Sequence, residues 1–404
     1  MKGEATPGKG AGLGLGFRVW KIRVNKVNKD RLKVLYNDVI RKRNGNMPKG
    51  LLYYAEEWDK MFENVKEMRR RAGKRTPLKT PPLPLLVKFI MPDGQTRGNK
   101  SAPAVIDLRK GELRIPSYGV RVPLRSSLVR ALIEENELEP RPEFTLQVTR
   151  KGLLRLIAHR ALRPPALGLP LRIVAIDENS LNGFTLAVWD VIKENRVALS
   201  MCRKMMPRNR GFIDAHAALL QSAADCNADK LKEARELLPL ELTSPEKLAE
   251  LARATKSKEK RLNKAFTEEL VALVRQLVRT AMNRGWSVAI VVDPIDHKSI
   301  RGSRLQRTLL RTRRALRNLA YYEGVTFASY RASGKRCPLC GQGGIKFAPR
   351  KYRCHSCALE WDRDKNAVYQ LAQKVLARYF REECSDDTYI DLAGWLREHP
   401  RALL

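Results

Sequence analysis

The chain has 404 residues, of which 43% are hydrophobic, so it is long enough for two or three domains with hydrophobic cores. Its formal net charge of +35 lies far outside the range of an ordinary soluble enzyme and indicates a polyanionic partner. The sequence shows no transmembrane run, no polybasic segment with a lipidation signal and no apolar secretory region, so the expected partner is a nucleic acid and not a membrane.

The first 80 residues are predicted to hold one strand and a helical segment after a flexible lead-in. Alternating residue types predict the strand at residues 17–27. Residues 30–43 and 51–71 have a helical pattern, and a proline-rich break at residues 76–84 ends the segment.

Short strands between glycine and proline turns follow as far as about residue 159. Their hairpin signals, such as Arg109-Lys110-Gly111, predict a small antiparallel barrel. The helical segment would then be an insertion between the first strand of the barrel and the others. The prolines in Arg163-Pro164-Pro165 mark the next domain boundary.

Strands and helices alternate in the second half of the chain. Three strands come first and are followed by a charged helical insertion at about residues 213–264 and by an amphipathic helix expected to begin at Thr267. Strand, helix and strand come next, and the last helix begins at Asp364. Two of the strands are strongly apolar and are expected to end at Asp177 and Asp293. This is the order of an RNase H-like core, so the predicted fold class is multidomain, a β domain followed by an α/β domain.

Asp177, Asp293 and Asp364 are the candidate catalytic residues. Carboxylates at the strand ends of an α/β sheet converge on one edge, where ligands usually bind. Three such groups can hold two divalent ions that activate a water and stabilise the leaving oxygen of a phosphodiester. Mg²⁺ suits oxygen ligands of this kind, with Mn²⁺ as a substitute. An aspartate after a strand can also start a turn or cap a helix, so the prediction depends on the three acids as a set.

Four of the seven cysteines form two C-x2-C pairs. Cys337 and Cys340 make the first pair, and Cys354 and Cys357 make the second after thirteen intervening residues. This spacing predicts a tetrahedral Zn²⁺ ribbon, and four thiolates leave no open position for catalysis, so the zinc is expected to be structural. His355 is expected to be exposed. Paired cysteines of this kind fit a reducing, cytoplasmic compartment.

A helix rich in arginine follows Asp293. Residues 301–317 contain seven arginines and no acid, whereas a solvated surface helix would normally mix the two charges. A single helical face would hold backbone phosphates without selecting a base sequence. The arginines predicted to bind nucleic acid are Arg304, Arg307, Arg311 and Arg314 on this face and, more weakly supported, Arg69, Arg70 and Arg71.

Together these motifs resemble the TnpB family, the transposon-encoded RNA-guided nucleases related to compact type V CRISPR effectors. VAIDENSLNGFTLAVWD resembles the first RuvC motif with Asp177, SVAIVVDPID the second with Asp293, and WDRDKNAVYQLA the third with Asp364. RASGKRCPLCG and YRCHSC resemble the zinc ribbon that precedes the third motif. The ribbon with its Asp-Arg-Asp-x-Asn-Ala sequence is the most specific part of the match, and the N-terminal half resembles the family only in layout.

The resemblance implies a prokaryotic RNA-guided DNA endonuclease. Its partners would be a guide RNA derived from the transposon end and target double-stranded DNA with a short flanking motif, while base pairing reads the target sequence. A homodimer is an open alternative. The implied domains are an N-terminal lead with the first wedge strand (1–27), a helical REC-like insert (28–80), a wedge-like β-barrel (81–165), a RuvC-like domain (166–332 and 361–383), an inserted zinc ribbon (333–360) and a C-terminal tail (384–404).

Two positions depart from the family pattern. Asp293 stands where the second motif normally has glutamate, which keeps the charge but shortens the reach by one methylene, on the order of 1.5 Å. Asn179 stands where the first motif usually has glycine. Neither change removes a carboxylate, so the expected metal site is retained.

Two other functions remain as alternatives. A family member could use guide RNA to occupy DNA without cutting it, as a repressor does, and the short Asp293 lends weight to this hypothesis. A guide-free nuclease or resolvase of RuvC type is the weaker alternative, and RNA that co-purifies at a fixed length would argue against it.

Overall fold

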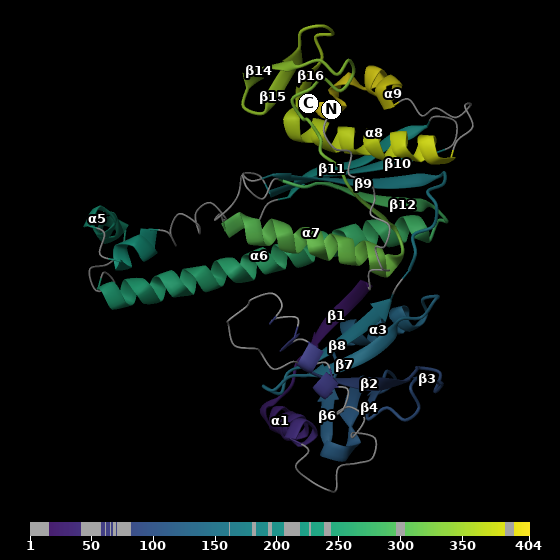
Figure 1. The fold of residues 1–404 in the computed structure, drawn as a ribbon, viewed down its shortest axis with the longest axis vertical. Coiled ribbons are helices and arrows are strands. Elements are labelled where there is room, and N and C mark those ends of the chain that lie inside the picture. Colours follow the sequence, from purple (N-terminus) through teal and green to yellow (C-terminus); the bar gives the residue numbers. More distant parts are fainter. Residues whose placement is uncertain are drawn as a thin grey trace. The chain divides into compact units, whose positions relative to one another are not determined.

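The computed structural model describes residues 16–41, 58–60, 62–64, 66–67, 70, 82–160, 162–179, 183–192, 196–205, 219–225, 228–237, 244–295, 304–383 and 392–404. The chain divides into two compact units, residues 1–162 and residues 163–404. Figure 1 shows their elements coloured along the chain. None of the described helices is long and apolar enough to cross a membrane.

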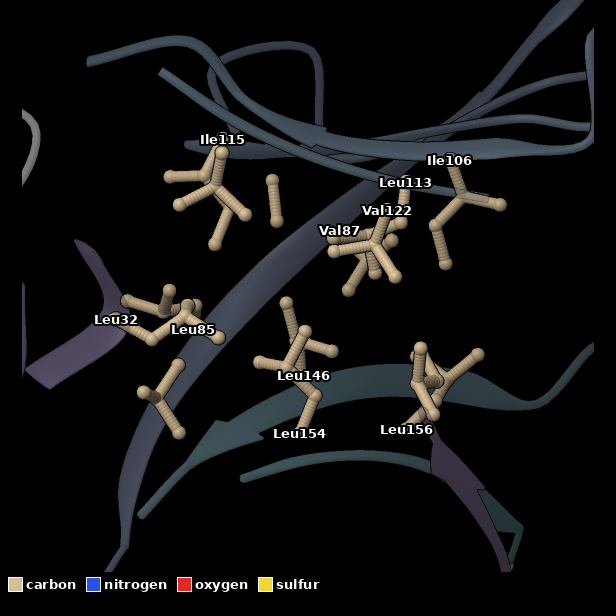
Figure 2. Packing of buried hydrophobic residues seen from close by; sticks show 14 of the residues in the cluster. Leu32, Leu85, Val87, Ile106, Leu113, Ile115, Val122, Leu146, Leu154 and Leu156 are labelled. Carbon is tan, nitrogen blue, oxygen red and sulfur yellow. The ribbon is translucent and has the colours of Figure 1, made fainter. Parts of the chain in front are cut away.

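The first unit is a curled eight-stranded sheet that encloses a hydrophobic core. The strands lie in the order β1-β8-β7-β2-β4-β5-β6, and β3 pairs with β2. Figure 2 shows side chains from several strands meeting Leu32 of α1 in this core. The elements are β1 (Gly16–Ile22), α1 (Lys26–Arg41), β2 (Leu83–Ile90), β3 (Thr96–Gly98), β4 (Ala104–Asp107), β5 (Glu112–Ile115), η1 (Pro116–Tyr118), β6 (Val120–Pro123), α3 (Ser126–Asn136), β7 (Glu143–Val148) and β8 (Leu154–Arg160).

Three features of this unit differ from the sequence prediction. β4 is parallel to β2, whereas an antiparallel barrel was expected. The chain reverses direction twice between these two strands. It turns back after β2 to form the antiparallel strand β3 and then turns again, so β4 runs in the direction of β2. The first strand ends at Ile22, and α1 begins at Lys26, inside the predicted strand. Helix α3 was not predicted, because it is short and buries few residues. The helix predicted at residues 51–71 lies mostly outside the described residues.

The second unit is a five-stranded mixed sheet between two layers of helices, as the order of elements predicted. Strands β9, β10 and β11 are antiparallel, and β12 and β13 continue the sheet in parallel with β9, in the order β11-β10-β9-β12-β13. The elements are β9 (Leu171–Asn179), β10 (Gly183–Val191), β11 (Val197–Met205), α5 (Ala228–Leu237), α6 (Pro245–Met282), β12 (Ser287–Asp293), α7 (Arg304–Glu323), β13 (Thr326–Ser329), β14 (Gly344–Ala348), β15 (Lys351–Cys354), β16 (Glu360–Asp362), α8 (Arg363–Glu383), α9 (Leu392–Glu398) and η3 (Pro400–Leu403).

The pleat of the sheet separates two hydrophobic cores. Successive residues of a strand point to opposite faces. Ile173 and Ala175 therefore pack in the core with α8, while Val174 and Ile176 pack in the core with α6 and α7. Figure 1 shows α8 on one side of the sheet and α6 with α7 on the other. This alternation decides which side chains at the strand ends face α8.

Helix α6 begins much earlier than predicted, at Pro245 and not at Thr267. The side chain of Ser244 accepts a hydrogen bond from the Lys247 N–H, and proline occupies the first turn, so Ser244 and Pro245 form a normal helix start. Thr267 lies within the helix, where its hydroxyl donates to the Asn263 carbonyl and contacts the Thr312 hydroxyl of α7 at 3.0 Å. The last part of the predicted insertion is therefore continuous with the helix that packs on the sheet.

A small three-stranded sheet, β14-β15-β16, carries the cysteine pairs and leads directly into α8. Trp361 of β16 is buried, and its indole N–H donates to the Gly334 carbonyl at 2.8 Å. A Cβ at Gly344 would lie 2.5 Å from the Trp361 ring, so only glycine allows this approach. Helix α9 packs Trp395 against Trp189 of β10, so this part of the segment expected as a tail adds to the core beside α8.

Candidate active site and zinc site

Asp177 and Asp293 lie opposite each other on neighbouring parallel strands. Strands β9 and β12 pair in a register that places Asp293 beside Asp177. Ala175 and Val291, two residues earlier on each strand, pack in the core with α8. Because side chains alternate along a strand, both aspartates point to the same side as α8. Strand β9 does not end at Asp177 as predicted but continues to Asn179, where it pairs with Gly183 of β10.

Asp364 lies in the first turn of α8 and is fully buried. Arg350 binds both of its oxygens, with Nε 2.7 Å from Oδ2 and Nη2 in contact with Oδ1. Lys204 of β11 is 3.6 Å from Oδ2. The position of the helix start is set by Asp362, whose Oδ1 accepts hydrogen bonds from the N–H groups of Asp364 and Lys365. The acid is therefore held in place by groups from the small sheet and from the large one.

The three aspartates interact electrostatically. Burial raises the pKa of Asp177 well above its usual value, and the carboxylates of Asp293 and Asp364 raise it further. Burial also raises the pKa of Asp293, against the effect of the Ala332 N–H, which donates to Oδ2 at 3.0 Å. The fold thus gathers negative charge at the strand ends beside the start of α8, where a divalent cation would offset the repulsion.

A cavity of about 290 Å³ opens at these strand ends. Two of the three aspartates line it, together with basic and small residues of the segment after β13 and of α8. The lining residues that carry charge are Asp177, Glu178, Asp293, Lys335 and Arg363.

The donor chemistry at Asp177 and Asp293 fits Mg²⁺, because both are carboxylates that line one cavity, Asp177 buried and Asp293 half-buried. Both oxygens of Asp364 accept hydrogen bonds from Arg350. Asp364 can therefore bind an ion only if Arg350 moves away or if one carboxylate oxygen contacts Arg350 and the ion together. Among the described residues, the four cysteines are the group whose ligand atoms all lie within 4.8 Å of one another, and the three aspartates do not form such a group. A pair of ions does not require every carboxylate to touch every other one.

The four predicted zinc ligands come together in the structure. The Sγ atoms of Cys337 and Cys357 are 3.4 Å apart, and those of Cys340 and Cys354 are 3.3 Å apart. Four mutually close sulfurs match a tetrahedral Zn²⁺ site with no open position. Although burial alone would raise it, the pKa of Cys354 is lowered to about 6, because the Cys357 N–H and the Cys340 side chain stabilise the thiolate. His355 is exposed.

Sequence reasoning missed two buried ion pairs around the acids. Glu178, the residue after Asp177, accepts from Arg313 Nε at 2.9 Å and from the Ile295 N–H at 3.2 Å. It therefore joins β9 to α7 and to the chain just after Asp293. The only sequence signal was the pair of adjacent acids at a strand end. Arg350 gave no signal, because its role depends on the turn between β14 and β15 that brings it to Asp364.

The predicted nucleic-acid-binding arginines are only partly described. Arg311 and Arg314 are exposed on α7, as their spacing predicted, while Leu309, Leu316 and Leu319 are buried in the core below. Arg304 and Arg307 belong to α7, but their side chains lie outside the described part. Arg70 is exposed and pairs with Glu67, and Arg69 and Arg71 lie outside the described residues.

The fold and the site define an α/β protein with an acidic cavity at its strand ends and a four-cysteine cluster beside it. Residues 311–371 match the family described as Cas12f1-like, TNB domain. The matched segment contains most of α7, the cysteine cluster and the start of α8 with Asp364. This match confirms the resemblance to the TnpB-like family. No protein of curated function matches the chain.

Several solved structures are similar at low sequence identity. A Cas12j structure bound to crRNA has a TM-score of 0.40 at 13% identity, and the match covers 65% of this chain and 60% of that one. A Cas12f1 complex with sgRNA and target DNA has a TM-score of 0.39 at 9% identity, with coverage of 85% and 79%. The chain therefore spans about 60% of the length of the Cas12j structure.

Proposed function

We propose that the protein is an RNA-guided DNA endonuclease of the TnpB type that cuts guide-matched DNA in a RuvC-like site. The observation that carries the proposal is the register of β9 and β12, which sets Asp293 beside Asp177 on the α8 side of the sheet, with the charge of Asp364 close enough to act on Asp177. The family match over the segment with Asp364 and the net charge of +35 support it.

In this proposal the second unit is an RNase H-like RuvC domain, at residues 166–332 and 361–383, with a zinc ribbon inserted at 333–360. The first unit would comprise a wedge-like barrel at 81–165 and a REC-like insert at 28–80, and would hold the guide RNA. The four cysteines would bind one structural Zn²⁺. The proposed partners are the guide RNA and double-stranded target DNA with a short flanking motif.

The aspartates and the basic groups in and near the cavity each have a proposed task. Asp177, Asp293 and Asp364 would bind two Mg²⁺ ions, which activate a water and stabilise the leaving oxygen when bound. Lys335 and Arg363 line the same cavity and would hold the phosphate. Arg350 would orient Asp364, and Arg311 and Arg314 on α7 would contact the backbone of the nucleic acid.

The test begins with the nucleic acid that purifies with the protein, because its sequence identifies the guide and hence the target. A linear DNA with the matching sequence should be cut in Mg²⁺. Asp364→Ala should lower the cleavage rate by on the order of 10⁴-fold, as the loss of a catalytic group does. Asp229→Ala, an exposed acid of α5, is the matched control and should cut at the normal rate. Cleavage that persists at the normal rate in Asp364→Ala would refute the assignment.

A second candidate is RNA-guided binding to DNA without cleavage. The contact between Arg350 and both oxygens of Asp364, together with the short side chain of Asp293, favours it. A complex that binds matched DNA but never nicks it in Mg²⁺ or Mn²⁺ would establish this candidate. Cleavage without any co-purifying RNA of fixed length would instead indicate a guide-free nuclease.

A further inference from the structure

A second cavity, of about 370 Å³, lies against α8 and the first cysteine pair. It has apolar walls, two side-chain amides and two basic groups. The lining residues used below are Arg336, Pro338, Leu339, Gln373, Lys374 and Ala377. Arg311 and Arg314, the two predicted nucleic-acid-binding arginines whose side chains the structure describes on α7, do not line it.

Consecutive parts of the same two segments line the two cavities. One wall is α8: Arg363 and Ala367 line the acidic cavity, and Gln370, Lys374 and Ala377 line the second one. These positions are spaced by four and three residues in turn, so they form one face of the helix. The centres of the two groups are about 13 Å apart along the helix axis.

The other wall is the segment between β13 and β14. Ala332 to Lys335 line the acidic cavity, and the next residues, Arg336 to Leu339, line the second one. Gln370 fixes this segment to α8, because its Oε1 accepts from the Ser333 N–H and its Nε2 donates to the Ser333 carbonyl, both at 2.9 Å. The amide of Asn366 makes a further link, because its Nδ2 donates to the carbonyls of Gly334 and Arg336. The two cavities are therefore neighbouring sites along two segments that are fixed to each other.

The groups in the second cavity suit a nucleobase. Pro338, Leu339 and Ala377 offer apolar surface for the faces of a ring. The half-buried amide of Gln373 is oriented by the Tyr369 hydroxyl, to which its Nε2 donates at 3.1 Å, and its Oε1 and second N–H suit a base edge. Arg336 and Lys374 are exposed at the cavity and suit the flanking phosphates. The Lys374 ammonium donates one hydrogen bond to the Arg331 carbonyl, which places it at the cavity rim. The charge of Lys374 also acts on Asp293, so the two cavities share one electrostatic environment.

We propose that this second cavity holds a base of the DNA strand whose phosphate lies in the acidic cavity. The proposal deepens the proposed function, since it assumes that a strand occupies the acidic cavity. Holding a nearby base of the same strand would fix which phosphate faces Asp177 and Asp293. The occupant is a single strand, because a base in a duplex is not free to enter a pocket.

The test needs neither a guide RNA nor cleavage. The full-length protein is mixed in Ca²⁺ with a single-stranded oligodeoxynucleotide that carries photoreactive 5-iodouracil, and crosslinked peptides are identified by mass spectrometry. We expect crosslinks in the segments 336–341 and 370–377. The double substitution Gln373→Leu with Ala377→Leu fills the cavity and removes the amide, and should abolish these crosslinks and weaken binding about tenfold.

The control is Ala254→Leu, which changes an exposed helical alanine of α6 outside both cavities. It should crosslink and bind as the unchanged protein does. Gln373→Leu alone is a smaller change and serves as the test if the double variant fails to fold. It should lower the crosslink yield. Unchanged crosslinks in the Gln373→Leu protein, crosslinks at other segments, or equal competition by RNA of the same sequence would overturn the proposal. The proposed nuclease function would stand or fall separately, on the Asp364→Ala cleavage assay.

Discussion

Asp177 destabilises the metal-free protein, because the fold buries it beside two other carboxylates. Its pKa is raised on folding, so the folded state binds this proton more tightly than the unfolded state does. The resulting contribution to stability is present below the unfolded pKa of about 4 and is lost as the pH rises through the raised folded pKa. The charged form at neutral pH therefore lowers the free energy of unfolding.

We predict that Asp177→Asn increases the free energy of unfolding of the metal-free protein by about 1–2 kcal/mol at pH 7. The difference from the unchanged protein should shrink as the pH falls toward 4, because Asp177 is then protonated in the folded state and increasingly protonated in the unfolded state. Urea unfolding from pH 4.5 to pH 8 measures it. Asp229→Asn is the exposed control and should change stability by less than about 0.5 kcal/mol. A destabilised Asp177→Asn protein at pH 7 would contradict the prediction.

Arg350 is the main partner of Asp364, whose carboxylate is fully buried. Removal of one member of a buried ion pair leaves an uncompensated charge. Arg350→Ala should therefore lower the free energy of unfolding by about 3 kcal/mol. Arg350→Lys should recover part of this loss, since lysine supplies the charge without the two-pronged geometry.

A double-mutant cycle with Asp364→Asn separates the pair from its surroundings. The double variant should lose less free energy of unfolding than the sum of the two single losses, because Asp364→Asn removes the charge that Arg350 neutralises. Strict additivity in urea unfolding would show that Lys204 and Arg363, which also lie near Asp364, carry the interaction instead.

At the scale of elements, the small sheet β14-β15-β16 depends on the four cysteines. Its strands are short and carry few buried side chains apart from Tyr352, Cys354 and Trp361. A zinc-selective chelator should therefore release amide protons of residues 344–362 to hydrogen exchange within the first minutes, while α6 and α7 stay protected. Peptides of β5 and β6 in the first unit are the internal control. Protection of residues 344–362 that survives chelation would show that packing on α8 suffices.

The elements of the second unit were largely predictable, because buried strands and amphipathic helices leave strong periodic patterns. The start of α6 was not, since the Ser244-Pro245 signal lay inside a stretch that appeared only charged and helical. The parallel pairing of β4 with β2 depends on contacts between distant strands, which periodicity does not encode. At the site, each aspartate could be chosen from its place at a strand or helix end. Glu178 and Arg350 could not, because their partners are distant in sequence.

At the scale of the whole molecule, the positive charge should govern binding to nucleic acid. Each neutralised phosphate lowers the slope of log K against log salt concentration by about 0.7 for a single strand. Arg311→Ala and Arg314→Ala should each weaken binding to single-stranded DNA. Each change removes about one phosphate contact and should therefore make this slope less steep by about 0.7. Fluorescence titrations at several NaCl concentrations measure it. Lys232→Ala, an exposed change in α5, should leave the slope unchanged, and equal slopes for all variants would contradict the prediction.

The spacing between the last cysteine and α8 limits how the chain can vary. Cys357 and Asp364 are seven positions apart, and β16 occupies part of that interval. One inserted residue within the first turn of α8, before Asp364, would rotate that side chain by about 100° around the helix axis. A transplanted ribbon would need the same number of residues at its exit, so domain shuffling between homologues should succeed only when this interval is conserved to the residue.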